Sequence, residues 1–427
     1  NTNGVTVELD FMIMGVSGFA MKYEAEDADL YGAKNKTTVE GFSGNGYAEF
    51  ISYDSSCVAF NINVKKDGDY AIKLHYALPS SSANVAFKIE YDEEGYLCAQ
   101  RLEPSKKYKS IYANNIAYLK AGEHQIFVTG LRGEWCLDYI EVVEVNDKIR
   151  KTVLPEPVLN NKKATKEAKK LFSYIWSIRG KGILSGQQIY NANTEDIKAI
   201  EAATGKTPAV LGIDLIDFSP SRVQKGANAG RVLSVAKNHW KAGGIVTCCW
   251  HWNAPMGLLD LNQPEKHWYD GFRTGATTFN FVNGLKDENS EEYKLMIRDI
   301  DAIAKQLKSL QDSNVPVLWR PLHEASGGWF WWGARGADSY IQLYRLVYDR
   351  LVNHHGLNNL IWVWNGQDPY WYPGDEYVDI ISYDYYPTKY RHGTANEYLE
   401  KIQSATSMPK ICAISENGSL PNIAKLE

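Results

Sequence analysis

Short apolar runs alternate with helical patterns from about residue 163 onward, and this alternation constrains the fold more than any other feature. The apolar runs at 209–214, 245–252, 317–319, 360–365 and 378–384 have the length of buried strands. Between them, apolar residues recur at helical spacing, which predicts helices at 164–178, 194–204, 291–310, 339–354 and 395–405. Strands that alternate with helices in this way are typical of a parallel sheet. We therefore predict a (β/α)8 TIM-type barrel for residues 163–427.

Polar residues stand where the predicted strands end. They are Gln187, Asp214, His251, Glu324, Asn365, Asp384 and Glu416. In a barrel of this kind the carboxyl ends of the strands form the active face. Glu324 and Glu416, at the ends of the predicted fourth and seventh strands, lie beside aromatic residues. A retaining glycosidase needs two carboxyls about 5–5.5 Å apart, so these two glutamates are a candidate catalytic pair. The alternative is that one of them only binds backbone N–H groups or an arginine.

The stretch VLWRPLHEASGGWFWWG, residues 317–333, surrounds the first glutamate with indole rings. Aromatic faces stack on the apolar faces of sugar rings, and a carboxyl among them is partly desolvated, which raises its pKa. Arg320 and His323 stand close enough to Glu324 in the sequence to influence its charge. The composition of this stretch therefore indicates carbohydrate chemistry.

In the first part of the chain, apolar residues recur at a different spacing. Residues 22–145 read as short strands with alternating apolar and polar residues, separated by turn sequences and without a helical segment. This pattern predicts an all-β sandwich. Residues 146–162, with Pro155 and Pro157, are predicted to be a semi-rigid linker. Residues 1–21 are left as a leader or unassigned segment, which lacks the basic start of a signal peptide.

Composition excludes several classes of protein. The net charge of −5 gives no basic footprint for nucleic acid. No apolar run approaches the roughly 18 residues that cross a bilayer, so we expect no membrane partner. The cysteines show no metal-ligand spacing; they are interpreted as unpaired core thiols, with one disulfide in the first 150 residues as the alternative.

The motifs YEAED, GFSGNGYAEF and LDYIEV resemble carbohydrate-binding modules of family 35, which are β-jelly rolls with a structural calcium ion. The resemblance implies that Glu24, Glu26 and Asp138 bind this calcium, and that Trp135, after the loop 130–134, stacks on a sugar. The residues alone leave alternatives. Three carboxylates without a basic neighbour suit an oxygen-only Ca²⁺ site, or they are solvated acids on a sheet face. Trp135 is either a binding platform or a core residue.

The motifs WRPLHE, GGWFWWG, WVWNGQD, SYDYYP and ISENG resemble glycoside hydrolase family 26, in which endo-β-1,4-mannanases predominate. The resemblance implies that Glu324 is the general acid/base and Glu416 the nucleophile. It also implies contact of Tyr386, or alternatively Tyr385, with the nucleophile. The remaining implied substrate contacts are His323 beside the acid/base, His251 and Trp252 on the glycone side, and Trp329 and Trp332 in the cleft wall. Ala325 and Ser326 depart from the Met-Asn that often follows the acid in the family.

Together these features predict a multidomain, secreted, retaining endo-β-1,4-mannanase that acts on mannan, glucomannan or galactomannan without a catalytic cofactor. The first alternative is the same machinery acting on mixed-linkage β-glucan or β-1,3-xylan, with specificity set by loops such as 253–281. The second is a non-catalytic polysaccharide-binding protein. The sequence ends shortly after the predicted seventh strand. We therefore expect that the last strand and helix of the barrel lie outside it, as would any cellulosomal or cell-surface attachment.

Overall fold

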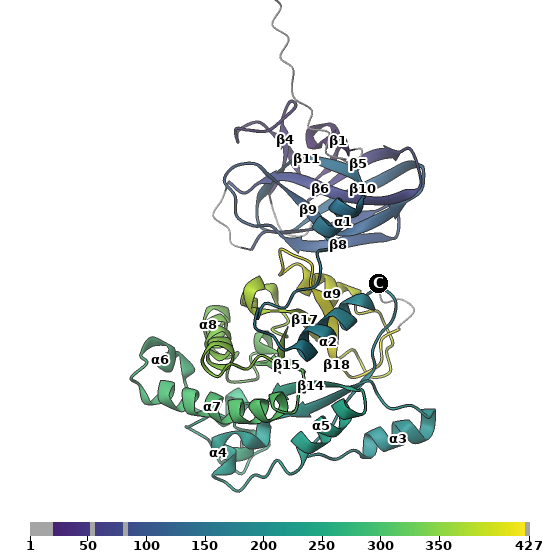
Figure 1. The fold of residues 1–427 in the computed structure, drawn as a ribbon. Helices are drawn as coiled ribbons and strands as arrows, with labels where there is room; N and C mark the ends of the chain where they lie inside the picture. The colour runs from purple at the N-terminus through teal and green to yellow at the C-terminus, as the bar shows by residue number, and fades with distance from the viewer. Residues whose placement is uncertain (1–19, 52–55, 80–83, 423–427) are drawn as a thin grey trace, which may run out of the picture. The chain divides into compact units, whose positions relative to one another are not determined.

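The computed structural model describes residues 20–51, 56–79 and 84–422, which divide into two compact units. One unit contains the residues up to Cys98 together with Glu103–Pro155, and the other contains Ala99–Leu102 and the chain from Glu156 onward. The first consists mainly of strands and the second of strands and helices (Figure 1). Among the residues so described, no helix has the length and hydropathy needed to cross a bilayer.

The first unit consists of two antiparallel sheets, as its alternating sequence predicts. One sheet has the order β3-β4-β11-β6-β9 with β1 also paired to β11, and the other has the order β2-β5-β10-β7-β8. The strands are β1 (Ala20–Glu24), β2 (Asp29–Tyr31), β3 (Lys34–Lys36), β4 (Tyr47–Phe50), β5 (Cys57–Val64), β6 (Gly68–Ala77), β7 (Ala86–Tyr91), β8 (Gly95–Arg101), β9 (Lys109–Leu119), β10 (Gly122–Arg132) and β11 (Trp135–Glu144). The alternation places one face of each strand in the core: Val58, Phe60, Ile62 and Val64 of β5 are all buried.

A short helix, α1 (Asp147–Val153), forms inside the segment that we predicted as linker. The Asn146 side chain accepts a hydrogen bond from the Ile149 N–H at 3.0 Å and caps the first turn. Ile149 and Val153 lie one turn apart and pack with Ala71 of the first unit. The predicted linker 146–162 therefore begins with a helix that the sequence analysis did not include, because two apolar residues four positions apart bury one face of it.

Trp135 is a core residue, so the prediction of a sugar-stacking ring at this position is wrong. It begins β11, its exposed fraction is 0%, and its ring stacks on Phe50 with centroids 4.2 Å apart. Phe87 packs against the same indole at 5.9 Å. Gly130 leaves the space that the two rings occupy, since a Cβ there would lie 3.0 Å from the Phe50 ring and 3.5 Å from the indole nitrogen. Trp135 therefore joins the two sheets instead of facing solvent.

We predict that Trp135→Ala destabilises the first unit by about 3–5 kcal/mol, the usual effect of removing a large buried aromatic ring. Urea unfolding followed by circular dichroism measures the change. Tyr118→Ala is the matched control, because Tyr118 belongs to the same unit and is 59% exposed; it should shift stability by less than about 0.5 kcal/mol. Equal midpoints for the Trp135 variant and the parent protein would contradict the assignment of this ring to the core.

The second unit contains parallel strands joined in sequence order from β12 to β18 (Figure 1). The strands are β12 (Gly186–Gln188), β13 (Val210–Asp214), β14 (Ile245–Trp250), β15 (Val317–Pro321), β16 (Leu360–Trp364), β17 (Ile380–Tyr385) and β18 (Ile411–Asn417). Consecutive parallel pairing requires a crossover after each strand, as the βα alternation predicts. Glu324 follows the fourth of these strands and Glu416 lies in the seventh, in agreement with the predicted order.

Helices lie between these strands. They are α2 (Lys166–Ser177), α3 (Glu195–Thr204), α4 (Pro220–Val223), α5 (Val232–Lys241), α6 (Phe281–Lys286), α7 (Glu291–Gln311), α8 (Ala337–Tyr348) with the π-helical turn η6 (Asp349–His354), and α9 (Asn396–Gln403). The long helix α7 begins where the Ser290 hydroxyl accepts a hydrogen bond from the Tyr293 N–H at 3.1 Å. Its buried face includes Ile300, Ala304 and Leu307, as the apolar spacing predicts.

All six cysteines carry free thiols, which agrees with the interpretation as core residues and not with the alternative of a disulfide. Cys98, Cys136, Cys248 and Cys249 are buried. Burial raises the pKa of the Cys98 thiol to about 12, so this thiol stays protonated and unreactive.

Candidate active site

The loop after β15 carries the first catalytic candidate in an unusual backbone conformation. Leu322 and Glu324 have φ values of 50° and 54°, in the left-handed region that L-residues avoid. The Glu324 N–H donates to the Asn365 backbone carbonyl at 2.7 Å and faces the Asn365 side-chain oxygen at 3.0 Å. Strain of this kind persists where the surroundings hold it in place. Asn365, at the tip of the neighbouring strand, thus fixes the position of Glu324.

Three carboxyl groups meet at the tips of β15, β17 and β18. One oxygen each from Glu324, Asp384 and Glu416 lies within 4.8 Å of the others. The two glutamates are therefore close enough for the retaining reaction, which uses carboxyls about 5–5.5 Å apart. Three neighbouring carboxyls cannot all carry a negative charge without strong repulsion. Their protonation states must therefore differ.

Arg320 supplies the positive charge in this cluster. Its side chain is 4% exposed; it donates to Asp384 Oδ2 at 3.2 Å and is also hydrogen-bonded to Glu416. Burial alone would raise the pKa of Glu416, but the Arg320 charge and the Tyr386 hydroxyl, which donates to Glu416 at 2.7 Å, lower it below its ordinary value. Glu416 is therefore ionised at neutral pH, as a nucleophile must be.

Glu324 has the opposite character. Burial and the negative charge of Asp384 raise its pKa to about 7, against the effect of the Trp329 indole N–H, which donates to Glu324 Oε2 at 2.9 Å. At neutral pH a large fraction of Glu324 therefore holds its proton. A protonated carboxyl beside an ionised one is the arrangement that an acid and a nucleophile require.

Asp384 is a site residue that the sequence reasoning did not assign, although it stands at a predicted strand end. It is 4% exposed and accepts hydrogen bonds from the Ser415 hydroxyl at 2.6 Å and the Asn365 amide at 3.0 Å. Burial raises its pKa, and the nearby charge of Glu416 acts in the same direction, while Arg320 opposes both. The sequence signal for this residue was an acid at the end of the strand-like run 378–384.

Two histidines form a hydrogen-bonded chain beside the carboxyls. His251 Nδ1 lies 2.6 Å from Asp214 Oδ2, and its Nε2 lies 3.2 Å from Nε2 of His323. Because His323 is 1% exposed, burial lowers its pKa well below the usual value, and the neighbouring His251 and Arg320 act in the same direction. His323 is therefore neutral. Because a neutral imidazole carries one N–H, His323 has one donor nitrogen and one acceptor nitrogen.

Of the aromatic residues expected in the cleft, two face solvent. Trp329 is 45% exposed and Tyr386 is 60% exposed, and both contact a candidate catalytic carboxyl. Tyr385 is buried and packs on Tyr398, with ring centroids 5.6 Å apart. Of the two alternatives, Tyr386 is therefore the residue that contacts the nucleophile.

The predictions that Trp252 and Trp332 line the cleft are wrong, since both are fully buried. The Trp252 indole donates to Asp299 at 2.9 Å, and the Trp332 indole donates to the backbone carbonyl of His323 at 2.8 Å. Buried indole N–H groups need such partners. Trp332 therefore supports His323 from the core, Trp252 packs among other indoles, and neither ring is exposed to a substrate.

Of the three acids expected to bind calcium, Glu24 and Asp138 contact Ser43 in the first unit, and Glu26 contacts the backbone two residues further on. The Ser43 hydroxyl donates to Glu24 at 2.9 Å and lies 3.3 Å from both Asp138 oxygens. Glu26 Oε1 accepts the Asn45 N–H at 2.6 Å. The expectation that no basic residue lies beside these acids is wrong. Lys22 forms an ion pair with Glu24 at 2.7 Å, and His75 contacts Asp138 at 2.7 Å.

A parallel βα sheet whose strand tips hold one ionised and one protonated carboxyl defines the second unit as a candidate retaining glycoside hydrolase. Comparison with known families agrees. Residues 160–426 match the family model described as glycosyl hydrolase family 26, and residues 21–146 match that of carbohydrate binding module family 35. The chain belongs to glycosyl hydrolase family 26 and carries an N-terminal module of family 35.

Two of the relatives described here match nearly the whole chain, and the third matches about three fifths of it. A mannan endo-1,4-beta-mannosidase of Thermothelomyces thermophilus is 39% identical over 94% of this chain and 80% of that protein. The Podospora anserina GH26-CBM35 beta-(1,4)-mannanase is 38% identical, with a TM-score of 0.59 over 96% of this chain and 88% of that one. A beta-mannanase from a symbiotic protist of the termite Reticulitermes speratus, solved with a gluco-manno-oligosaccharide, is 33% identical, with a TM-score of 0.56 over 62% of this chain and 83% of that one.

We predict that Asp384→Asn lowers the pKa of Glu324 from about 7 toward its ordinary range. The substitution removes a negative charge that favours the protonated form of Glu324, so deprotonation becomes easier. Titration of ¹³C-labelled glutamate carboxyls by NMR measures the shift. Asp299→Asn is the control, because Asp299 is also a buried carboxyl but contacts Trp252 and Arg298 instead of the cluster. An unchanged Glu324 titration in the Asp384 variant would contradict this electrostatic role.

Proposed function

We propose that this protein is an endo-β-1,4-mannanase that cleaves mannan-type polysaccharides by double displacement with retention of configuration. The observation that carries the proposal is the pairing of an ionised Glu416 with a Glu324 that titrates near neutral pH, their carboxyl oxygens within 4.8 Å. Relatives of known activity across the length of the chain supply the substrate class, since they are named as mannan endo-1,4-beta-mannosidases. The chemistry needs only the two carboxyls and water, without a cofactor.

In the first step, a Glu416 oxygen attacks the anomeric carbon and forms a glycosyl ester. The bond from that carbon to the leaving oxygen breaks, and the leaving oxygen takes the proton of Glu324. In the second step, the Glu324 carboxylate removes a proton from water, whose oxygen attacks the same carbon and releases Glu416. Two inversions restore the original configuration. Both carboxyls end in their starting protonation states.

The neighbouring side chains have separate roles in this proposal. Tyr386 and Arg320 hold the nucleophile through the bonds described above, and the ring nitrogens of His251 and His323 offer hydrogen-bonding groups beside the sugar at the reaction centre. The half-exposed face of Trp329 stacks on a sugar next to the acid/base. Because its indole also donates to Glu324, binding of the leaving group and orientation of the acid are coupled.

The same machinery could act on mixed-linkage β-glucan or β-1,3-xylan, but the named activities of the relatives favour mannan. The termite-protist relative was solved with a gluco-manno-oligosaccharide, which supports glucomannan as a substrate. The paired protonation states of Glu324 and Glu416 count against a purely binding role. Mannan-type polysaccharides lie outside cells, so we propose that the protein is extracellular.

We also propose that the first unit is a jelly-roll module that binds a mannan-type polysaccharide and holds a structural calcium ion. Glu24, Glu26 and Asp138 would be the ligands, since hard cations prefer carboxylate oxygens. The fit is supported by Glu26 Oε2, which is buried without a hydrogen-bond partner. Binding at Glu24 would replace its ion pair with Lys22. With Trp135 in the core, the sugar must be bound by other residues of the module.

We predict that the protein releases reducing ends from β-mannan and glucomannan, and not from mixed-linkage β-glucan or β-1,3-xylan. A reducing-sugar assay on the four polymers measures this. Glu416→Ala should reduce turnover at least about 1,000-fold while mannan binding persists, because the nucleophile is lost and the cleft is not. Cleavage of only the mixed-linkage β-glucan or only the β-1,3-xylan would contradict mannan as the substrate. Near-parental turnover by the Glu416 variant would overturn the mechanism.

We predict that Ca²⁺ stabilises the first unit, by about 2.7 kcal/mol at a free concentration one hundred times the dissociation constant. Thermal unfolding in Ca²⁺ and in EDTA measures the difference. Glu26→Gln should abolish the response because it removes a charged ligand, and Glu134→Gln, at an exposed acid of the same unit, should retain it. Identical unfolding curves with and without Ca²⁺ in the parent protein would refute the calcium site.

A further inference from the structure

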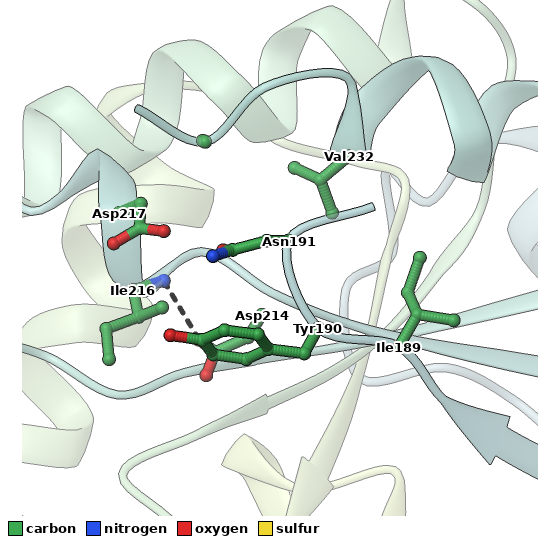
Figure 2. Close-up of a pocket in the computed structure, with 8 residues that line it drawn as sticks. Ile189, Tyr190, Asn191, Asp214, Ile216, Asp217 and Val232 are labelled. Carbon is green, nitrogen blue, oxygen red and sulfur yellow. Dashed lines mark hydrogen bonds between the residues drawn. The ribbon is translucent and has the colours of Figure 1, made fainter. Parts of the chain in front are cut away.

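A hollow lies between the loops that follow β12 and β13, at the ends of the strands that form the active face. Tyr190 and Asn191 line it from the first loop, and Asp214 and Asp217 from the second, with Val232 closing one side (Figure 2). Its polar lining is fixed: Asp217 is 6% exposed and accepts the Arg222 guanidinium N–H at 2.9 Å. Asp214 accepts the Ile216 N–H at 2.9 Å. The mechanism proposed above uses none of this surface.

Tyr190 presents an aromatic ring at this hollow. It is 65% exposed, among the most exposed large apolar side chains of the described residues. The turn behind it is tight: Asn191 and Ala192 both have left-handed backbones, with φ values of 47° and 59°, and the Tyr190 carbonyl accepts the Asn193 N–H at 2.9 Å. Two consecutive non-glycine residues in this region are strained, and such strain collects at ligand sites. The turn thus holds the ring outward.

A chain of side-chain contacts links the hollow to the catalytic centre. Asp214, which lines it, contacts His251 at 2.6 Å, and His251 contacts His323 at 3.2 Å, next to Glu324. The position of the hollow in the strand order also indicates in which direction the sugar chain runs. Glu324 and Trp329 follow β15 and receive the leaving group, whereas the hollow lies beyond His251 at the tips of β12 and β13. Sugars that extend away from the leaving group therefore run toward Tyr190.

We propose that Tyr190 forms a subsite for a hexopyranose unit on the glycone side, more than one residue away from the cleaved bond. The ring stacks on the apolar face of the sugar, and the Asn191 amide, which both donates and accepts, hydrogen-bonds its hydroxyl groups. The inference rests on the proposed function, because it assigns the position of a substrate residue in that cleft. It identifies Tyr190 as a determinant of preference for longer chains.

The test compares Tyr190→Ala and Tyr190→Phe with the parent protein on manno-oligosaccharides of three to six residues. A stacking contact of this kind changes kcat/KM by roughly 10-fold. We expect that loss for Tyr190→Ala on the hexasaccharide, with a smaller loss as the chain shortens, and near-parental values for Tyr190→Phe. Tyr174→Ala is the matched control, since Tyr174 is 49% exposed on α2 away from the strand tips, and it should change none of these values.

An equal loss at every chain length, an equal loss in Tyr174→Ala, or no loss on the hexasaccharide would each overturn the proposal. A second measurement separates it from the proposed function. Titration calorimetry with mannohexaose on Glu416→Ala, with and without Tyr190→Ala, reports binding without turnover. Binding weakened about 10-fold by the second substitution supports the subsite even if the parent protein cleaves no mannan. Equal binding in the two proteins refutes it.

Discussion

The buried guanidinium of Arg320 is the interaction on which the arrangement of the candidate active site depends. It lies between Asp384 and Glu416, and the two acids gain a shared positive charge in a place from which water is largely excluded. Charges buried without a partner are strongly unfavourable. Although burial alone would lower the pKa of Arg320, these two carboxylates raise it, so the guanidinium stays charged. Without it, Glu416 would lose the positive charge that lowers its pKa against the effect of burial.

A layer of buried tryptophans supports this charge cluster. Trp252 donates to Asp299, Trp331 donates to the Trp252 carbonyl at 2.6 Å, and Trp332 donates to the His323 carbonyl. Each indole thus fixes one polar group with its N–H and fills space with its ring. Of the tryptophans that follow the acid/base, Trp331 and Trp332 therefore have a structural role, and Trp329 alone remains exposed for contact with a sugar.

The fold class and the catalytic candidates could be predicted from the sequence. The fold class depends on the spacing of apolar residues, and the candidates on their positions at the ends of strands. Apolar strands alternating with helices require a parallel sheet, and residues at strand tips such as Glu324 and Glu416 meet on one face whatever their spacing in the chain. The sequence was insufficient for Trp135, Trp252 and Trp332, because an indole suits a buried core and a sugar platform equally well. Only the neighbours decide: Phe50 covers Trp135, and its position follows from a strand pairing that no local pattern encodes.

The helix α1 and the acid Asp384 escaped prediction for a related reason. The helical segment Asp147–Val153 is too short for a periodic signal, and it folds because Ile149 and Val153 find an apolar face formed by distant strands. Asp384 could be recognised as a polar strand-end residue. Its role depends on Arg320 and Glu416, which reach it from two other strands. Electrostatic roles of this kind are properties of the assembled sheet.

The charge cluster also accounts for the change of role that double displacement asks of Glu324. In the free enzyme the negative charges of Asp384 and Glu416 both favour its protonated form, so it begins as an acid. When Glu416 becomes a glycosyl ester, its charge disappears, and one of the two negative charges that raise the pKa of Glu324 disappears with it. Arg320 then has one fewer counter-charge, which further favours ionised Glu324. The pKa of Glu324 therefore falls at the stage where it must accept a proton from water. The same carboxyl can act as acid and then as base because its partner in the reaction is also its electrostatic neighbour.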